Sequence, residues 1–167
     1  AQAEYSTQKV TAYATFGNSF IKYTYKNWFV HDPDANGGNG DYLTAETDYL
    51  PGYQIKGGVS YRPVGGFSVF ANYGYISKAP IFDNIISDRD GTVADDVQNE
   101  IFNAVEVGVN YITPRRNLDI KANYYYTTWK NRALNIGITN QDGSEGFIFV
   151  NGMDQLHSGF ELEAYYK

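Results

Sequence analysis

The sequence predicts an all-β protein: an incomplete, antiparallel, up-and-down transmembrane β-barrel of about seven long strands. Three observations predict it. Apolar and polar residues alternate with a period of two through most of the chain, the connections between alternating segments are short and long in turn, and one face of these segments carries no charge. Because successive side chains of a strand point to opposite faces, this alternation indicates a sheet with one apolar and one polar face.

The clearest strand is the segment YQIKGGVSYR at 53–62, in which Tyr53, Ile55 and Tyr61 share one face. A Pro- and Gly-containing turn at 63–66 then reverses the chain, as in a β-hairpin. The other six predicted strands are 8–16, 19–30, 67–76, 104–112, 118–129 and 158–167.

The connections are typical of an outer-membrane barrel. The short ones are expected at 17–18, 63–66 and 113–117, and the long ones at 31–52, 77–103 and 130–157. Strict alternation places all short turns at one end of the sheet, as in bacterial barrels with short periplasmic turns and long extracellular loops. Soluble domains rarely carry three long loops, because their median connection is about 4–6 residues.

The distribution of charge favours a face in contact with lipid. We assign the following side chains to that outer face: Val10, Ala12, Ala14, Phe16, Ile21, Tyr23, Tyr25, Phe29, Val69, Ala71, Tyr73, Val105, Val107, Val109, Ile120, Ala122, Tyr124, Phe160, Leu162 and Ala164. The opposite face receives the charged residues Lys9, Lys22, Lys26, Lys56, Glu106, Asp119, Lys121, Glu161 and Glu163. A basic side chain facing lipid at the midplane costs about 2–4 kcal/mol, which explains the exclusion.

Strand length and tyrosine placement agree with this interpretation. Ten residues at about 3.3 Å each, tilted by about 45°, span roughly the 25 Å apolar band of a barrel. Tyrosines gather toward strand ends, where an amphipathic ring suits the membrane boundary. These are Tyr53, Tyr61, Tyr75, Tyr111, Tyr126 and Tyr166.

The composition excludes several classes of protein. A net charge of -6 argues against a nucleic-acid partner, which requires a basic surface. The chain has no cysteine, so neither a disulfide framework nor a thiolate metal site can form. No run of 18 apolar residues is present, so a transmembrane helix is not predicted.

Several ordered blocks resemble the late barrel strands of TonB-dependent receptors, especially those of Bacteroidetes-type bacteria. The blocks are YQIKGGVSYRPVGGFSVFANYGYISKAPIFDN from residue 53, NEIFNAVEVGVNY at 99–111, YYYTTWKNRAL at 124–134 and NGMDQLHSGFELEAYYK at 151–167. The resemblance covers 53–167 closely and 1–52 in general character.

This resemblance implies a location in the outer membrane of a Gram-negative bacterium and import of a scarce nutrient such as an iron chelate, cobalamin or a glycan. It implies as partners the membrane lipid, the nutrient, the TonB complex reached through a plug region, and a surface lipoprotein. Residues 1–167 are then expected to form part of one barrel domain, with the plug and the remaining strands outside this sequence.

No catalytic, cofactor or metal site is predicted. The head of a calcium loop occurs at 32–37 (DPDANG), but Leu43 stands where the bidentate glutamate belongs, so a turn is the simpler interpretation. The other candidates considered are Asp88, Asp90, Asp95 and Asp96 as an acidic cluster, Glu161 and Glu163 as a carboxylate pair, His31 and His157, and the glycine-rich segment 37–40. None has the partners that its chemistry requires.

The three long loops hold 14 of the 19 acidic residues, so an acidic extracellular rim is expected. The alternative function is that of a soluble, aromatic-rich β-domain that binds carbohydrate by stacking sugars on Tyr and Trp rings. A repeat of about 48 residues also resembles a propeller blade, but a blade requires four strands per repeat and this repeat supplies two.

Overall fold

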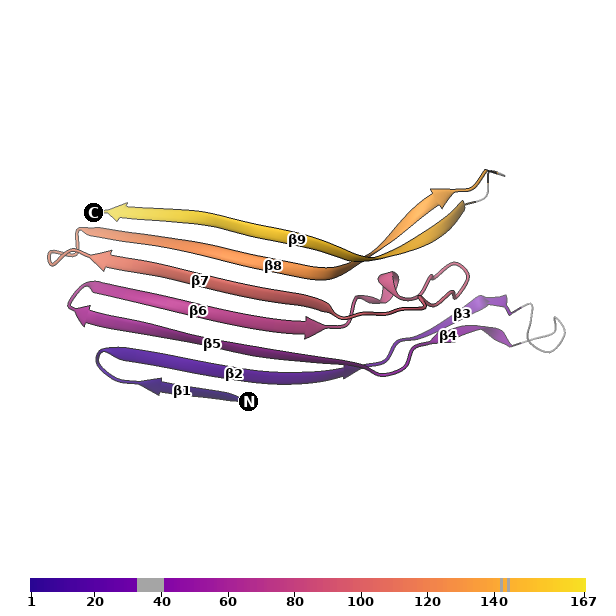
Figure 1. The fold of residues 1–167 in the computed structure, drawn as a ribbon, viewed down its shortest axis with the longest axis horizontal. Coiled ribbons are helices and arrows are strands. Elements are labelled where there is room, and N and C mark those ends of the chain that lie inside the picture. Colours follow the sequence, from indigo (N-terminus) through magenta and orange to yellow (C-terminus); the bar gives the residue numbers. More distant parts are fainter. Residues whose placement is uncertain (33–40, 142, 144) are drawn as a thin grey trace.

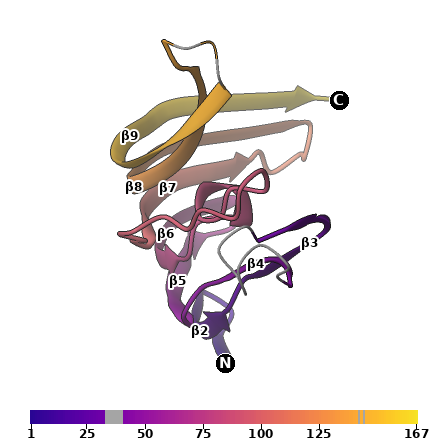
Figure 2. The same ribbon diagram turned by 90° about the vertical axis from the view of Figure 1, so that its right-hand side faces the viewer.

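The computed structural model describes residues 1–32, 41–141, 143 and 145–167. Seven strands form one antiparallel sheet in the order β1-β2-β5-β6-β7-β8-β9. Their bounds are Gln2–Ser6 (β1), Val10–Ile21 (β2), Leu50–Val64 (β5), Phe67–Lys78 (β6), Glu100–Ile112 (β7), Leu118–Thr139 (β8) and Glu145–Tyr166 (β9). The sheet is a single layer that follows an arc from β2 to β9 (Figures 1 and 2).

The sheet is an open section of a barrel. Within the described residues β1 and β9 are its two edges and do not pair with each other. The antiparallel, up-and-down class is therefore confirmed, and so is its incompleteness. No helix in this part of the chain is long and apolar enough to cross a membrane.

The short turns lie at one end of the sheet and the longer connections at the other, as predicted (Figure 1). Gly66 has a φ of +77° in the β5–β6 turn, and an added Cβ would lie 2.3 Å from the carbonyl oxygen of Ile112. Glycine is required there because other residues adopt positive φ at a cost and would also collide with the backbone of β7.

The predicted turn at 17–18 was wrong. Gly17 and Asn18 lie inside β2 and pair with Gln54 and Tyr53 of β5. The first turn instead lies at 7–9 and joins β2 to β1, a strand that was not predicted. A Gly-Asn pair is a common hairpin signal, but the 15-residue strand β5 supplies pairing partners along the whole of β2.

This error also changed the face assigned to several residues. Ile21 pairs with Leu50 on the polar face, opposite to its prediction, because β2 continues without a turn. Tyr23, Tyr25 and Phe29 leave the main sheet, so their assignment to its apolar face was wrong. Tyr25 and Phe29 lie in β3 (Thr24–His31), which pairs with β4 (Tyr42–Glu46), and Tyr23 directly precedes β3.

The long connections contain more structure than predicted. Residues 130–157 were expected to be a loop, but β8 and β9 continue through them as a paired extension up to Thr139 and Glu145. The register shifts between Trp129 and Leu134, where Asn131 has a φ of 55°, and the extension turns away from the sheet there (Figure 1). The segment 79–99 has little regular structure beyond the short helix η2 (Phe82–Asn84).

The register confirms the apolar face of the main sheet. Val107 lies opposite Ala71 on one side and Tyr124 on the other, and Val59 lies opposite Ala12 and Ala71. No charged residue occurs on this face between the two tyrosine-rich ends. The first charge is Lys130, opposite Ile101 at the end with the longer connections.

This apolar face stays uncovered. Val107 in its centre is 44% exposed, and no second sheet packs on it in the described part of the chain. A soluble sandwich would bury such a face against another sheet about 10 Å away. The uncovered aliphatic face therefore favours a membrane-spanning sheet over a soluble carbohydrate-binding domain.

Candidate functional site

The polar face lies on the inside of the arc. Along β7, side chains of the apolar face such as Val105 and Val107 are exposed, whereas Glu106 and Asn110 of the polar face are partly buried. Side chains crowd together on the inside of a curved sheet and spread apart on the outside. The polar face is thus the concave face, which would line the lumen of a barrel.

One row of side chains crosses the whole concave face. Directly paired residues of neighbouring strands place their side chains beside one another on the same face. The row, which we call the central row, consists of Glu4, Tyr13, Gly58, Asn72, Glu106, Tyr125 and Gly159. It brings together residues from seven strands that are up to 155 positions apart in sequence.

Hydrogen bonds link the central row to the next row. The Tyr13 hydroxyl donates to Oδ1 of Asn72 at 3.3 Å, and the Asn72 amide donates to Glu106 at 3.2 Å. The Asn123 amide donates both to Glu106, at 3.2 Å, and to Glu161, at 3.0 Å. Each carboxylate is thereby held by an amide, which fixes its position on the wall.

Two tyrosines of the central row lie close to the glycines that oppose them on the neighbouring strands. A Cβ added at Gly58 would be 2.5 Å from Cε1 of Tyr13, and one added at Gly159 would be 2.6 Å from the hydroxyl of Tyr125. Each ring therefore reaches across to the neighbouring strand and covers the glycine that opposes it.

Between these two rings the wall forms a shallow cavity of about 390 Å³, which we call the tyrosine pocket. Its lining residues are Tyr13, Lys56, Asn72, Tyr73, Gly74, Ile76, Phe102, Ala104, Val105, Glu106, Tyr125 and Thr127. The pocket combines aromatic faces with amide, carboxylate, hydroxyl and ammonium groups. Gly74 and Ala104, which pair directly across β6 and β7, are the smallest residues of this lining.

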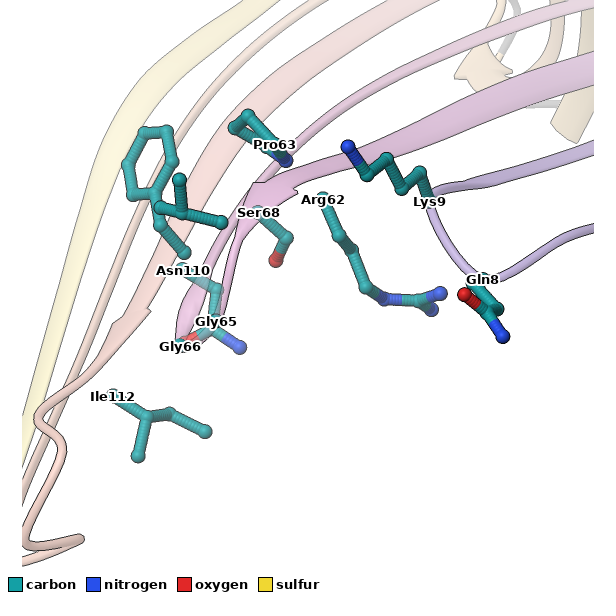
Figure 3. A pocket seen from close by; sticks show the side chains of 11 residues that line it. Gln8, Lys9, Arg62, Pro63, Gly65, Gly66, Ser68, Asn110 and Ile112 are labelled. Carbon is teal, nitrogen blue, oxygen red and sulfur yellow. The ribbon is translucent and has the colours of Figure 1, made fainter.

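A second cavity of about 450 Å³ lies at the end with the short turns. Lys9 of the β1–β2 turn and Arg62 of β5 lie along one side of it, and Ser68 and Asn110 belong to the concave face beside them (Figure 3). The short-turn end therefore carries basic groups, whereas most acidic residues lie at the other end.

The only fully buried apolar side chains in the described residues lie beyond the far end of the sheet. Here the β3–β4 hairpin, the segment 79–99 and the β8–β9 extension form what we call the cap. Ile85 and Ile86 are 0% exposed in it. The Tyr23 hydroxyl donates to the carbonyl of Pro80 at 3.0 Å, and its ring packs edge-on against Phe82 at 5.9 Å.

Hydrogen bonds from asparagine side-chain amides connect the segment 79–99 to its neighbours. Asn84 donates to the carbonyl of Ala133 at 2.8 Å, and Asn135 donates to that of Asp83 at 3.0 Å. Asn151 donates to the carbonyl of Asp96 at 3.1 Å. These bonds supply partners to backbone carbonyls that an irregular segment cannot pair within itself. The segment 79–99 is therefore fixed to its neighbours within the cap.

Charged groups are held in place both where β6 and β7 meet the cap and within the cap itself. The carboxylate of Glu100, which is 3% exposed as a residue, forms an ion pair with Lys78 at 3.0 Å. In the segment 79–99, the backbone amide of Thr92 donates to Asp90 at 3.0 Å, and this bond holds the pKa of the Asp90 carboxyl below its usual range.

The residues considered for catalysis or metal binding are placed as follows. The calcium-loop head at 32–37 and the glycine-rich segment 37–40 lie outside the described residues, except for Asp32. Among the residues that the structure describes, which include Asp88, Asp90, Asp95 and Asp96, no three His, Asp or Glu side chains gather as a possible metal site.

Glu161 accepts a hydrogen bond from Asn123, and Glu163 forms an ion pair with Lys121 at 3.6 Å. Both carboxylates are thus part of the polar wall. His31 stacks on Tyr42 at 4.9 Å in the cap, and His157 lies opposite Thr127 on the concave face.

Sequence reasoning did not single out the tyrosines and asparagines of the central row. Each of them is an ordinary polar or aromatic position of an alternating strand, and only the register between strands places them together. The available signal was the recurrence of glycine on the polar face, at Gly58, Gly108 and Gly159, each opposite an aromatic residue.

Comparison with known proteins identifies the family. The chain matches the model of the family described as TonB dependent receptor-like, beta-barrel, over residues 4–167. No curated protein and no solved structure matched it. The match covers nearly all of the sequence and agrees with the open antiparallel sheet, its uncovered apolar face and its polar concave face. The chain therefore belongs to the TonB-dependent receptor-like β-barrel family, whose members are transporters of the Gram-negative outer membrane that act with TonB on an external ligand.

Proposed function

We propose that residues 1–167 form one section of the barrel wall of a transporter that imports a scarce nutrient such as an iron chelate, cobalamin or a glycan. The observation that carries this proposal is the sidedness of the sheet. Val59, Val107 and their neighbours form a charge-free outer face, while Asn72, Glu106 and Asn123 form a hydrogen-bonded inner face. A transporter wall needs lipid contact on one side and a hydrated path on the other.

The open edges support a larger barrel. An unpaired strand edge in lipid leaves backbone N–H and C=O groups without partners, at several kcal/mol each. We infer that further strands of the receptor pair with β1 and β9, that a plug region outside this sequence occupies part of the lumen, and that TonB acts through that plug. The cap then faces the cell exterior, and membrane lipid surrounds the apolar face.

Nutrient uptake tests this proposal. Cells in which the receptor gene is deleted, along with close paralogues, are expected to lose uptake of one nutrient among ferric siderophores, cyanocobalamin and a panel of polysaccharides. A plasmid copy of the receptor should restore that uptake only while TonB is present. Unchanged uptake of every nutrient in the deletion strain, or full restoration without TonB, would show that the chain is not part of such a transporter.

A further inference from the structure

We propose that Lys9 and Arg62, which we call the basic pair, form a carboxylate-binding site at the short-turn end of the lumen, and that the carboxylate belongs to the plug region. This inference rests on the proposed function and identifies one contact through which the barrel wall holds the plug. The observation that carries it is the position of two like charges beside each other on one cavity, with no acidic residue in its lining.

The backbone places the two cations side by side. The N–H of Arg62 donates to the carbonyl of Lys9 at 2.7 Å, which extends the pairing of β2 and β5 by one residue beyond Val10 and Tyr61. Both side chains line the cavity of about 450 Å³ at the short-turn end (Figure 3). Like charges directly opposite each other destabilise a sheet, so this arrangement is more stable with an anion beside it. Lys56, another lysine of the concave face, has no second cation opposite it.

The described part of the chain supplies no counter-charge to the basic pair. Neither side chain forms an ion pair or a hydrogen bond within it, and none of the described residues that line the cavity is acidic. Elsewhere along the sheet, Lys121 pairs with Glu163 at 3.6 Å and Lys78 pairs with Glu100 at 3.0 Å. The wall thus neutralises these two lysines itself, whereas the basic pair is left for an anion from another part of the receptor.

The groups around the cavity suit a carboxylate. The guanidinium of Arg62 presents parallel N–H groups that bind both oxygens of a carboxylate, and the ammonium of Lys9 adds a second positive charge. Ser68 and Asn110 of the concave face line the same cavity and carry neutral hydrogen-bond donors. A carboxylate placed there would be bound by two cations on one side and by polar groups on the other.

The position of the cavity indicates where the carboxylate comes from. Ser68 and Asn110 place the cavity on the concave face, whereas membrane lipid contacts the opposite face, so a lipid phosphate does not reach it. A nutrient enters from the cap, at the far end of the sheet, and stays only briefly. The plug region remains in the lumen, so one of its acidic side chains can neutralise the basic pair for as long as the plug is in place.

Chemical cross-linking of the intact receptor tests this contact. A carbodiimide condenses a carboxylate with a neighbouring amine into an amide, with loss of water, and adds no spacer between them. We expect mass spectrometry of the digested product to show Lys9 joined to an acidic residue of the plug region. In the Arg62→Lys variant, position 62 should become joined to the same plug peptide.

Two results of the cross-linking would overturn the site. One is the absence of any link between position 9 or 62 and the plug, and the other is a link from these positions only to acids within residues 1–167. If TonB-dependent uptake is intact in that receptor, the transporter proposal survives and only the site is lost. A purified protein without a plug region would overturn both proposals.

Ionic current through the intact receptor in planar bilayers measures how firmly the plug is held. Arg62→Glu places a negative charge against the plug carboxylate and should raise the mean current by about tenfold or more, equivalent to about 1.4 kcal/mol. Arg62→Lys keeps the charge and should stay close to wild type. The excess current of Arg62→Glu should diminish in about 1 M salt, where the screening length is about 3 Å.

Arg115→Glu is the matched control, because Arg115 is an exposed arginine of the β7–β8 turn that does not line the cavity. Its current should equal that of the wild type. Equal currents in the Arg62→Glu and Arg115→Glu variants would contradict a specific contact at the basic pair. Thermal unfolding of each variant identifies a folding defect, and if Arg62→Glu shows one, the cross-links at positions 9 and 62 decide the question.

Discussion

Replacing Val107 by Arg is expected to lower the free energy of unfolding of the intact receptor by about 2–4 kcal/mol in a lipid bilayer. Val107 lies in the middle of β7 between Ala71 and Tyr124, on the face that carries no charge. A guanidinium at this depth has to be transferred from water into hydrocarbon. Denaturant unfolding of the receptor in phospholipid vesicles measures the change.

Ser60→Arg is the matched control for this substitution. Ser60 lies at nearly the same level of the sheet, in the row that joins Phe70 and Gly108, but on the concave face. A hydrated lumen can solvate the new charge, so the loss of stability should be much smaller. Equal losses at Val107 and Ser60 would contradict the assignment of the two faces.

Replacing Ile86 by Ala is expected to destabilise the packing of the cap by about 2–5 kcal/mol, the usual cost of removing a buried aliphatic side chain. Ile86 is 0% exposed and forms a bridge with Val93 that closes the segment 79–99. The main sheet shares few of these contacts, so the effect should be local. Trypsin cleavage after Arg89, which is exposed, should become faster in the intact receptor.

Ile81→Ala provides the comparison within the same segment, because Ile81 is 56% exposed. Its cleavage rate should remain close to that of the wild type. If Ile86→Ala and Ile81→Ala gave the same rate, the segment would be a mobile loop on the receptor, and the packed cap described above would not persist in solution.

The parts of the fold that could be predicted are those in which burial is decided by alternation alone. The strands predicted at 53–62, 67–76, 104–112 and 118–129 all lie within β5, β6, β7 and β8. In these segments apolar residues at nearly every second position alternate with polar or charged residues. A shift by one residue would therefore place charges in lipid, which fixes the face of each strand.

The N-terminal third was harder to predict because its local signals oppose its tertiary context. Gly17 and Asn18 form a plausible two-residue turn, yet they pair across β5. That pairing depends on residues more than thirty positions away. Once a turn was placed there, the periodicity assigned Ile21 to the wrong face, and the strand β1 was not predicted.

The candidate site could be predicted only in part, for the same reason. The sequence indicates that Lys56 and Glu106 share the polar face. It does not show that Tyr13, Asn72 and Tyr125 lie in one row, because this requires the register of four separate strand pairs. Similarly, β8 and β9 continue past residue 130 because they pair with each other, although their local sequence is polar and glycine-containing.

Depth-dependent quenching in the bilayer tests the central claim most directly. The chain contains no cysteine, so single cysteines can be introduced into it and labelled with a fluorophore in the intact receptor. Labels at positions 107 and 109 are predicted to be quenched by lipids brominated on their acyl chains, whereas labels at positions 60 and 110 are not. Equal quenching at all four positions, or none at any of them, would contradict a wall with lipid on one face and a hydrated lumen on the other.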